Sequence, residues 1–344
     1  MYYSLKSTIS ASLPTVSHSF PGRILATSLD SARACQDNMP MDLPEGYKSG
    51  FVAVAGRPNV GKSTLINAYL GQMVAAVSPK PQTTQRRQLG IFTTENAQVI
   101  FVDTPGIHEP LHRLGERMNS EAESSLEDSD LILVIFSLRV PPTADDRRVA
   151  QHIQKYRKKK PVLSALNKMD LLEADELSER IKTFEALLPD VEMIPVSATL
   201  GDNRERLLDR IIALLPEGPQ YYPQEQITDL YEREIAVDLI RAAALQNLRN
   251  EVPHAIAVRI DEYKDRNDHG AYIEATLFVE RESQKGIVIG KGGSMLKVIG
   301  SSARKEIEAL TGRKVFLKLR VKVLRGWRND PNALKRFQYG NDQK

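Results

Sequence analysis

A glycine-rich segment near the start of the chain constrains its fold more than any other feature. From Gly56 to Ser63 it reads G-R-P-N-V-G-K-S, which fits the pattern G-x-x-x-x-G-K-[ST]. The apolar run from Phe51 to Ala55 precedes it, and the helix-like run from Thr64 to Leu70 follows it. This strand-loop-helix order lets backbone N–H groups turn toward phosphates at a helix N-terminus. The segment therefore predicts a nucleoside triphosphate site.

Two side chains of this loop predict chemistry at the phosphates. Lys62 is expected to reach the β and γ phosphates, and the Ser63 hydroxyl is expected to ligate Mg²⁺. The alternative is a chance glycine loop, which the flanking strand and helix disfavour. The residues expected to contact the nucleotide here are Gly56, Arg57, Pro58, Asn59, Val60, Gly61, Lys62, Ser63 and Thr64.

A second motif, Asp103-Thr104-Pro105-Gly106, ends the apolar strand from Gln98 to Val102. An aspartate at the carboxyl end of such a strand can hold Mg²⁺ through a water molecule, and the Gly106 N–H can meet the γ phosphate. The pattern D-x-x-G is weak by itself and gains weight from its place after the phosphate loop. Asp103, Thr104, Pro105 and Gly106 are therefore expected to contact the nucleotide.

Two further motifs indicate the base. Asn167-Lys168-Met169-Asp170 follows the buried-looking strand from Pro161 to Leu166. The Asp170 carboxylate can accept hydrogen bonds from the guanine N1–H and 2-amino groups, and adenine presents the wrong edge for this. An ordinary strand-to-helix turn is the alternative. After the next apolar strand, Ser197 and Ala198 would supply a backbone contact to the guanine oxygen. The expected guanine contacts are Asn167, Lys168, Asp170, Ser197 and Ala198.

In this order and spacing, the motifs resemble those of the Era family of bacterial GTPases, from about Ser49 to about Asn341. The resemblance implies a P-loop domain that hydrolyses GTP to GDP and phosphate. It also implies that residues 78–84 form the first switch, where Thr84, favoured over Thr83, closes over Mg²⁺ and the γ phosphate. The implied catalytic residues are Lys62, Thr84, Asp103 and Gly106, and the implied Mg²⁺ ligands are Ser63, Thr84 and, through water, Asp103.

Two positions bear on the hydrolysis rate. Ras-like enzymes orient the attacking water with a glutamine, whereas Ile107 stands at that place and has no hydrogen-bonding group. Slow intrinsic turnover is therefore expected. Asn59 matches an asparagine that binds K⁺ in related potassium-activated GTPases, so a K⁺ ion beside the phosphates is a hypothesis. The alternative is that Asn59 bonds to the local backbone where the helix starts.

Length and patterning predict two folded domains. The 344 residues, 41% of them hydrophobic, suffice for two cores. Alternating strand and helix patterns predict a mostly parallel α/β sheet with helices on both faces, in a GTPase domain over 49–215. The run from Pro216 to Pro223 predicts a linker over 216–228. The single cysteine, Cys35, argues against a disulfide framework, and no apolar run approaches the length of a membrane span.

Residues 1–48 are rich in Ser, Pro and Ala and lack periodicity, which predicts an extension without packed structure. One interpretation is a targeting peptide. The other is a start codon set too early, with Met39 or Met41 as the true start. We favour the second, because the segment lacks the arginine-rich run of a transit peptide and the long apolar core of a secretory signal.

The C-terminal part predicts a polyanionic partner. Residues 284–344 contain 15 Lys and Arg against 4 acidic residues, whereas the whole chain has 47 against 44. Within this part, G-K-G-G from Gly290 to Gly293 lies between helical stretches at 283–289 and 294–310, as the nucleic-acid loop of KH domains does. Lys291 is followed by glycine rather than Ser or Thr, so this is not a second triphosphate loop.

The order of elements extends the resemblance to the end of the chain. A helix at 229–248, strands at 255–262 and 272–280, the loop with its helices, and a strand at 315–323 predict an α+β type II KH domain over 229–344, with a basic C-terminal tail. Val288 is expected to line the groove for bases, and Trp327 either stacks on a base or packs in the core. The expected RNA contacts are Ile287, Ile289, Gly290, Lys291, Gly292, Gly293, Lys318, Arg320 and Lys322.

The two halves together predict an RNA-binding GTPase that uses GTP or GDP and Mg²⁺. The resemblance implies binding to the unpaired 3′ end of 16S rRNA and a role in assembly of the small (30S) ribosomal subunit. It also implies a cytoplasmic monomer with peripheral association at the inner face of the cell membrane. Two alternatives stay open: an RNA-binding adaptor with a static nucleotide domain, and a tRNA-modification GTPase, whose family ends in a helical domain with a reactive cysteine.

Overall fold

The computed structural model describes residues 43–75, 84–107, 109–249, 252, 255–265 and 270–337, all within one of the two units into which the chain divides, Met39–Lys344. Most of the predicted extension lies outside these residues. The first strand begins at Lys48, just before the expected start of the domain, and Tyr47 is already buried. Among the described residues, no helix has the length and apolar character needed to cross a membrane.

The N-terminal half forms a six-stranded sheet with the order β2-β3-β1-β4-β5-β6. Its strands pair in parallel except for β2, which is antiparallel to β3. The mostly parallel sheet of the prediction is confirmed. Its elements are β1 (Lys48–Ala55), α2 (Lys62–Leu70), β2 (Gln88–Thr93), β3 (Ala97–Asp103), α3 (Arg113–Asp128), β4 (Leu131–Ser137), α4 (Ala144–Gln154), β5 (Val162–Asn167), the 3₁₀ turn η2 (Met169–Leu171), α5 (Ala174–Glu185), β6 (Glu192–Val196) and α6 (Arg204–Leu214).

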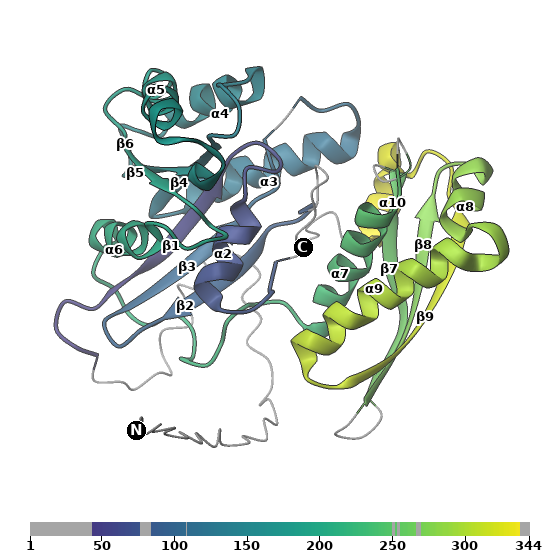
Figure 1. Cartoon of the computed structure of the whole chain (residues 1–344). Coiled ribbons are helices and arrows are strands. Elements are labelled where there is room, and N and C mark those ends of the chain that lie inside the picture. Colours follow the sequence, from purple (N-terminus) through teal and green to yellow (C-terminus); the bar gives the residue numbers. More distant parts are fainter. Residues whose placement is uncertain are drawn as a thin grey trace, which may run out of the picture. The chain divides into compact units, whose positions relative to one another are not determined.

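Helices cover both faces of this sheet (Figure 1). Leu65 of α2 and Leu207 of α6 pack in the core on one face. Leu126 of α3, Val149 of α4 and Phe184 of α5 pack in the core on the other. Strands buried on both faces are mostly apolar, which is why β1, β3 and β4 each contain a continuous hydrophobic run. The carboxyl ends of the parallel strands are left at one edge, where the motif loops meet.

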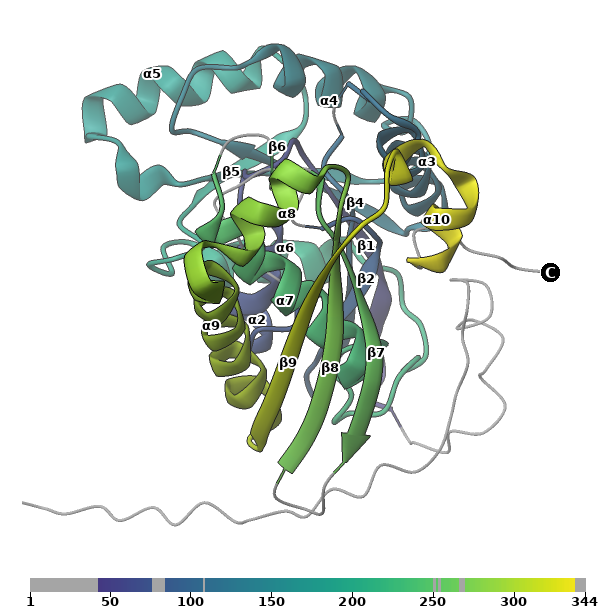
Figure 2. The same cartoon turned by 90° about the vertical axis from the view of Figure 1, so that its right-hand side faces the viewer.

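The C-terminal half forms a three-stranded sheet with the order β7-β8-β9. β8 is antiparallel to β7 and parallel to β9, and the parallel pair needs the crossover that α8 and α9 supply. Helices α7 and α9 pack on one face of this sheet, and Figure 2 shows the strands from the other face. This is the predicted KH arrangement. Its elements are α7 (Glu232–Asn247), β7 (Ala257–Asp265), β8 (Gly270–Val279), α8 (Glu282–Ile289), η5 (Lys291–Gly293), α9 (Ser294–Thr311), β9 (Lys314–Val323), η6 (Trp327–Asn329) and α10 (Pro331–Arg336).

The segment predicted as a linker is held against the GTPase sheet. The buried Gln98 side chain accepts hydrogen bonds from the backbone N–H groups of Tyr221 (2.8 Å) and Tyr222 (3.0 Å) and donates one to the Tyr222 carbonyl (2.8 Å). The Ile91 N–H donates to the Ile227 carbonyl at 2.8 Å. Asp229 accepts a further hydrogen bond, from the Leu89 N–H. The linker is therefore bound to β3 through Gln98 and to the edge strand β2 through Ile227, and Asp229, just beyond it, binds β2 as well.

Two expectations for the KH domain have definite outcomes. Val288 is fully buried in the core, so the expectation that it lines a groove for bases is wrong, because neighbouring residues of a helix face different sides. Trp327 is also fully buried, and its indole N–H donates to the Ala255 carbonyl at 3.0 Å. Of the two roles considered for Trp327, packing in the core is the observed one.

Removing the Gln98 side chain should loosen the linker. We expect Gln98→Ala to lower the free energy of unfolding by about 1–3 kcal/mol, the cost of leaving buried backbone groups without partners. Urea unfolding would measure this change, and limited proteolysis should show faster cleavage between residues 216 and 228. Thr93→Ala is the control, because it removes only the hydrogen bond between Gln98 and Thr93. Equal effects of the two substitutions would contradict the role given to Gln98.

Candidate active site

The phosphate loop joins the end of β1 to the first residue of α2, Lys62. Gly61 has φ 104°, and a Cβ added there would lie 2.2 Å from the Asn167 Nδ2 atom. Gly106 is similarly constrained, since an added Cβ would lie 2.7 Å from the Pro58 nitrogen. Glycine at these two positions lets loops from three strands approach one another.

Lys62 is buried within this loop. Its ammonium group donates to the carbonyls of Gly56 (3.3 Å) and Arg57 (3.4 Å). Burial is the main cause that lowers the pKa of Lys62, and the nearby Asp103 opposes it. Phosphate oxygens would favour the charged ammonium in the same way, so the position suits the role predicted for Lys62.

Three predicted Mg²⁺ ligands converge. The hydroxyls of Ser63 and Thr84 donate to Asp103 Oδ2 at 2.7 and 3.2 Å, and their two oxygens lie 3.2 Å apart. Asp103 Oδ1 is buried and has no hydrogen-bond partner among the described residues. Burial raises the pKa of the Asp103 carboxyl, which a bound cation would offset. An all-oxygen donor set with one unsatisfied carboxylate oxygen fits Mg²⁺.

Sequence reasoning missed one polar neighbour of this set. The buried Gln88 amide donates to Asp103 Oδ2 at 3.4 Å. Gln88 begins β2 and belongs to no motif, so its only signal was an amide at the start of a mostly apolar strand. It is placed to orient the carboxylate.

The base-binding motifs meet through Asn167. Its amide donates to the Val60 carbonyl at 2.8 Å, and its carbonyl oxygen accepts from the Ala198 N–H at 3.0 Å. Lys168 donates to the Asn59 carbonyl at 2.8 Å, and burial lowers its pKa. Asp170 lies exposed in η2. The structure thus brings the four motifs of the sequence to one edge of the sheet.

Some predicted contact residues use their side chains elsewhere. The Arg57 guanidinium pairs with the buried carboxylate of Asp146 at 3.0 Å, and the Thr104 hydroxyl donates to the Val54 carbonyl at 2.8 Å. Val60 is fully buried in the core. These residues can therefore meet a nucleotide through their backbone groups. The pairing of Arg57 with Asp146 had no local sequence signal, because the residues are 89 positions apart.

The structure also shows the surroundings of Ile107 and Asn59, the two positions expected to affect the rate of hydrolysis. Ile107 is 3% exposed and packs in the core beside α3, so its side chain is unavailable to a water molecule. Asn59 has φ 64°, a left-handed conformation that asparagine tolerates. The N-cap of α2 is Gly61 rather than Asn59. Of the first switch, residues 78–83 lie outside the described residues, and Thr84 lies within them.

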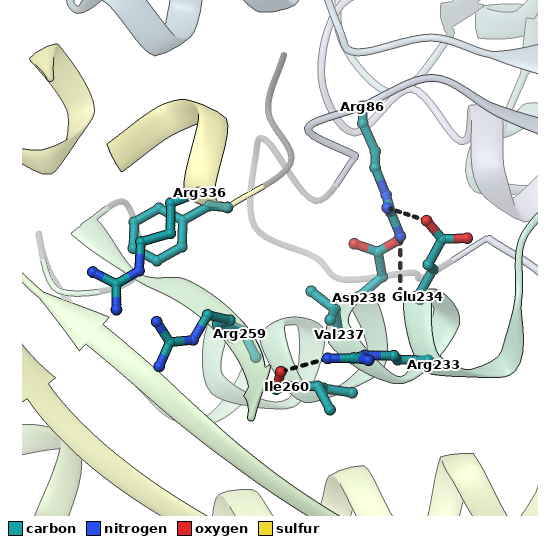
Figure 3. A pocket seen from close by; sticks show the side chains of 10 residues that line it. Arg86, Arg233, Glu234, Val237, Asp238, Arg259, Ile260 and Arg336 are labelled. Atoms are coloured by element: carbon teal, nitrogen blue, oxygen red, sulfur yellow. Dashed lines mark hydrogen bonds and ion pairs between the residues drawn. The ribbon is translucent and has the colours of Figure 1, made fainter. Parts of the chain in front are cut away.

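Arg86 connects the switch segment to the KH domain. Its guanidinium forms ion pairs with Glu234 (3.3 Å) and Asp238 (3.2 Å) of α7 (Figure 3). With Arg233 and Arg259 it lines a cavity of about 190 Å³. Sequence reasoning missed these pairs, whose partners are 148 and 152 positions away.

The G-K-G-G loop has the backbone that its glycines allow. Gly290, Gly292 and Gly293 have φ of 71°, 60° and 82°, and a Cβ on Gly290 would lie 2.8 Å from the Met295 nitrogen. Nothing lies within 4 Å of a Cβ on Gly292 or Gly293. The loop therefore presents open backbone to a ligand.

The side chains predicted to bind RNA fall on two surfaces. Lys291 and Ile287 are exposed, and Ile289 is half-buried, at the loop and on α8. The exposed Val298 of α9 was missed. Three basic residues, Lys318, Arg320 and Lys322, are exposed on β9, whose alternate residues Leu317, Leu319 and Val321 pack with the helices. The structure thus places these cations on the sheet face opposite the helices that carry the loop.

Replacing Asp170 should weaken the preference for guanine. We expect Asp170→Asn to reduce selectivity for GTP over ATP by about 1–3 kcal/mol, because an amide repels one of the guanine donors. Competition binding measures this ratio. Asp175→Asn, on the exposed start of α5, should leave it unchanged, and Lys62→Ala should abolish binding of both nucleotides. Unaltered selectivity in Asp170→Asn would refute the assignment.

Comparisons with known proteins agree with this geometry. The model of a family described as 50S ribosome-binding GTPase matches residues 51–168, and that of the KH domain matches residues 251–328. A solved structure of Era in complex with MgGDPNP and nucleotides 1506–1542 of 16S ribosomal RNA has 40% identity and a TM-score of 0.81; the match covers 86% of this chain and 100% of that one. An Aquifex aeolicus Era variant bound to GDP.AlF4⁻ matches with the same values. The chain belongs to the Era family of GTPases.

Proposed function

We propose that this GTPase binds the unpaired 3′ end of 16S rRNA through its KH domain and acts in assembly of the small (30S) ribosomal subunit. The observation that carries the proposal is the 40% identity, over 86% of this chain and the whole of the other, to an Era protein in complex with MgGDPNP and a 16S rRNA segment. The exposed G-K-G-G loop and the basic C-terminal part of this chain support it.

The enzymatic activity is hydrolysis of GTP to GDP and phosphate. Mg²⁺ supplies the charge that neutralises the β and γ phosphates when it is bound. We propose that Ser63, Thr84 and, through water, Asp103 hold this ion. Lys62 and the Gly106 N–H then stabilise the charge on the γ phosphate. Because Ile107 offers no group to orient water, we expect slow intrinsic turnover.

The switch contacts support a coupling of the two activities. Thr84 hydrogen-bonds to Asp103, and two residues later Arg86 forms ion pairs with α7 of the KH domain. A change at Thr84 on GTP binding would therefore strain or relax contacts to the RNA-binding domain. We propose that the GTP form docks or frees that domain and that hydrolysis resets the protein.

Family membership argues against the alternatives of a static adaptor and a tRNA-modification GTPase. We propose the domain division of the sequence prediction, with a GTPase domain over 49–215, a linker over 216–228 and a KH domain over 229–344. A cytoplasmic monomer that associates peripherally with the cell membrane also stays a prediction from the resemblance.

Binding of RNA by the GTP-loaded protein tests the proposal. An RNA that copies the 3′ end of 16S rRNA should bind more tightly than a scrambled RNA of equal length, because KH loops read unpaired bases. Changing both Lys291→Asp and Gly292→Asp should remove this preference. Filter binding or fluorescence anisotropy would measure it. Equal, strongly salt-dependent binding of both RNAs would instead indicate a purely electrostatic contact and refute the specific target.

Comparison of K⁺ with Na⁺ tests the cation hypothesis. If Asn59 coordinates K⁺ beside the phosphates, then GTP hydrolysis should be faster in K⁺ than in Na⁺, and Asn59→Ala should abolish the difference. Lys62→Ala gives the background rate. If the ratio of the hydrolysis rates in K⁺ and in Na⁺ is the same in Asn59→Ala as in the wild type, the hypothesis is refuted.

A further inference from the structure

The KH sheet has a face that no described helix covers at the Tyr272 end of β8. Strand pairing places Lys264, Tyr272 and Phe316 in one row across this face, next to the row of Glu262, Glu274 and Lys318. Figure 2 shows the three strands from this side, with α9 beyond them. The other end of the face, at Phe278, is covered by Trp327 and α10. The open area is therefore confined to the end where β9 begins.

An exposed aromatic pair lies in this open area. The rings of Tyr272 and Phe316 stack with centroids 5.6 Å apart and planes at 10°. Phe316 is 61% exposed, and the Tyr272 hydroxyl donates to Glu274 at 2.9 Å. One face of the Tyr272 ring is thus occupied, and the Phe316 ring remains accessible to a flat partner. A nucleobase is such a partner, and stacking on an aromatic ring tolerates any base.

A hollow beside Phe316 adds unpaired positive charge. Its volume is about 430 Å³, and it is lined by Arg304 of α9, by Lys314 and Phe316 of β9, and by Glu308. The Glu308 carboxylate is engaged with the Val315 N–H at 2.9 Å. Within the described part of the chain, neither Arg304 nor Lys314 has a side-chain hydrogen bond or ion pair. These two cations are available to phosphates.

The basic residues further along β9 also favour a nucleic-acid partner. Lys318 and Arg320 share a single acid, Glu274, at 3.0 and 2.6 Å. Lys322 has no ion-pair partner among the described residues. A protein partner would require a broader apolar centre than one stacked pair. Aromatic rings flanked by cations are the arrangement that single-stranded nucleic acid requires.

We propose that the Phe316 surface, defined as Tyr272, Phe316, Arg304 and Lys314, binds single-stranded RNA beyond the nucleotides held by the G-K-G-G loop. One base stacks on Phe316, and the flanking phosphates pair with Arg304 and Lys314. This inference rests on the proposed RNA-binding function and extends it.

The Phe316 surface is separate from the loop. α9 has 18 residues and runs from the loop to the turn before β9, so it separates the two sites by about 27 Å along its axis. A KH loop clamps about four nucleotides, which do not span this distance together with a second contact. Only a longer RNA engages both.

RNA length therefore separates the two contacts. We would measure the Kd of the GTP-analogue-loaded full chain for two RNAs copying the 3′ end of 16S rRNA, one of about 4 nucleotides and one of about 16. The wild type should bind the longer RNA more tightly. Phe316→Ala should weaken binding of the longer RNA by about 5- to 150-fold, the loss of one stacked base, and leave the shorter one unchanged. Changing both Arg304→Glu and Lys314→Glu should do the same.

Tyr231→Ala is the matched control, because Tyr231 is also 61% exposed but lies at the start of α7, outside the Phe316 surface. It should bind both RNAs as the wild type does. A 5-iodouridine at the far end of the longer RNA should crosslink to Tyr272 or Phe316.

Other outcomes distinguish the two proposals. If Phe316→Ala still binds the longer RNA more tightly than the shorter one by the same factor as the wild type, the Phe316 surface is not an RNA site. RNA binding at the G-K-G-G loop would then still stand. Failure of the wild type to bind either RNA overturns the RNA-binding function itself. A change in the sedimenting mass of Phe316→Ala, with RNA binding intact, would show self-association at this surface and likewise overturn the inference.

Discussion

The buried amide of Asn167 holds the nucleotide-binding edge together. It donates to the phosphate loop at Val60 and accepts from the base-binding loop at Ala198, so one side chain fixes the loops that follow β1, β5 and β6. Such a bond has its full value only in a dry interior, where an unpaired amide would be costly. Gly61 follows from the same constraint, because a side chain there would occupy the space of the Asn167 amide. Contacts within the protein therefore fix the relative positions of these loops.

Much of this arrangement could be predicted from the sequence. Parallel strands between two helical layers contain continuous apolar runs, so β3 and β5 were predicted to within one residue at each end, and the predicted end of β1 is correct. The start of β1 lies three residues before the predicted one, because its first residues, Lys48 and Ser49, are polar. The glycine loops carry their own signal, because their spacing encodes a backbone conformation. The contacts of Gln88 and the pairing of Arg86 with Glu234 could not be predicted, since they join residues far apart in sequence. The burial of Val288 could have been predicted, because helical periodicity places its side chain on a different side of the helix from those of Ile287 and Ile289.

In the KH domain, successive side chains of strand β9 face opposite sides of the sheet. Leu317, Leu319 and Val321 of β9 pack toward the helices, and the residues between them are exposed. One strand therefore completes the core and carries the cations. Placement of the loop follows from topology, because β8 and β9 are parallel and their connection must cross the sheet. The exposed glycine turn lies in the middle of that crossover.

The attachment of the linker has a consequence for how the chain can vary. Connections between domains ordinarily tolerate insertions, because loop closure becomes only slowly more costly with length. Here the Gln98 side chain forms hydrogen bonds with the backbone of Tyr221 and Tyr222. The backbone N–H groups of Ile91 and Leu89 form hydrogen bonds with Ile227 and Asp229, a few residues further along the chain. The few residues between these two points have a fixed span to bridge. An added residue there would need to bulge outward or break one attachment. Among related proteins, the number of residues between the two attachments should therefore stay constant, even where the residue types differ.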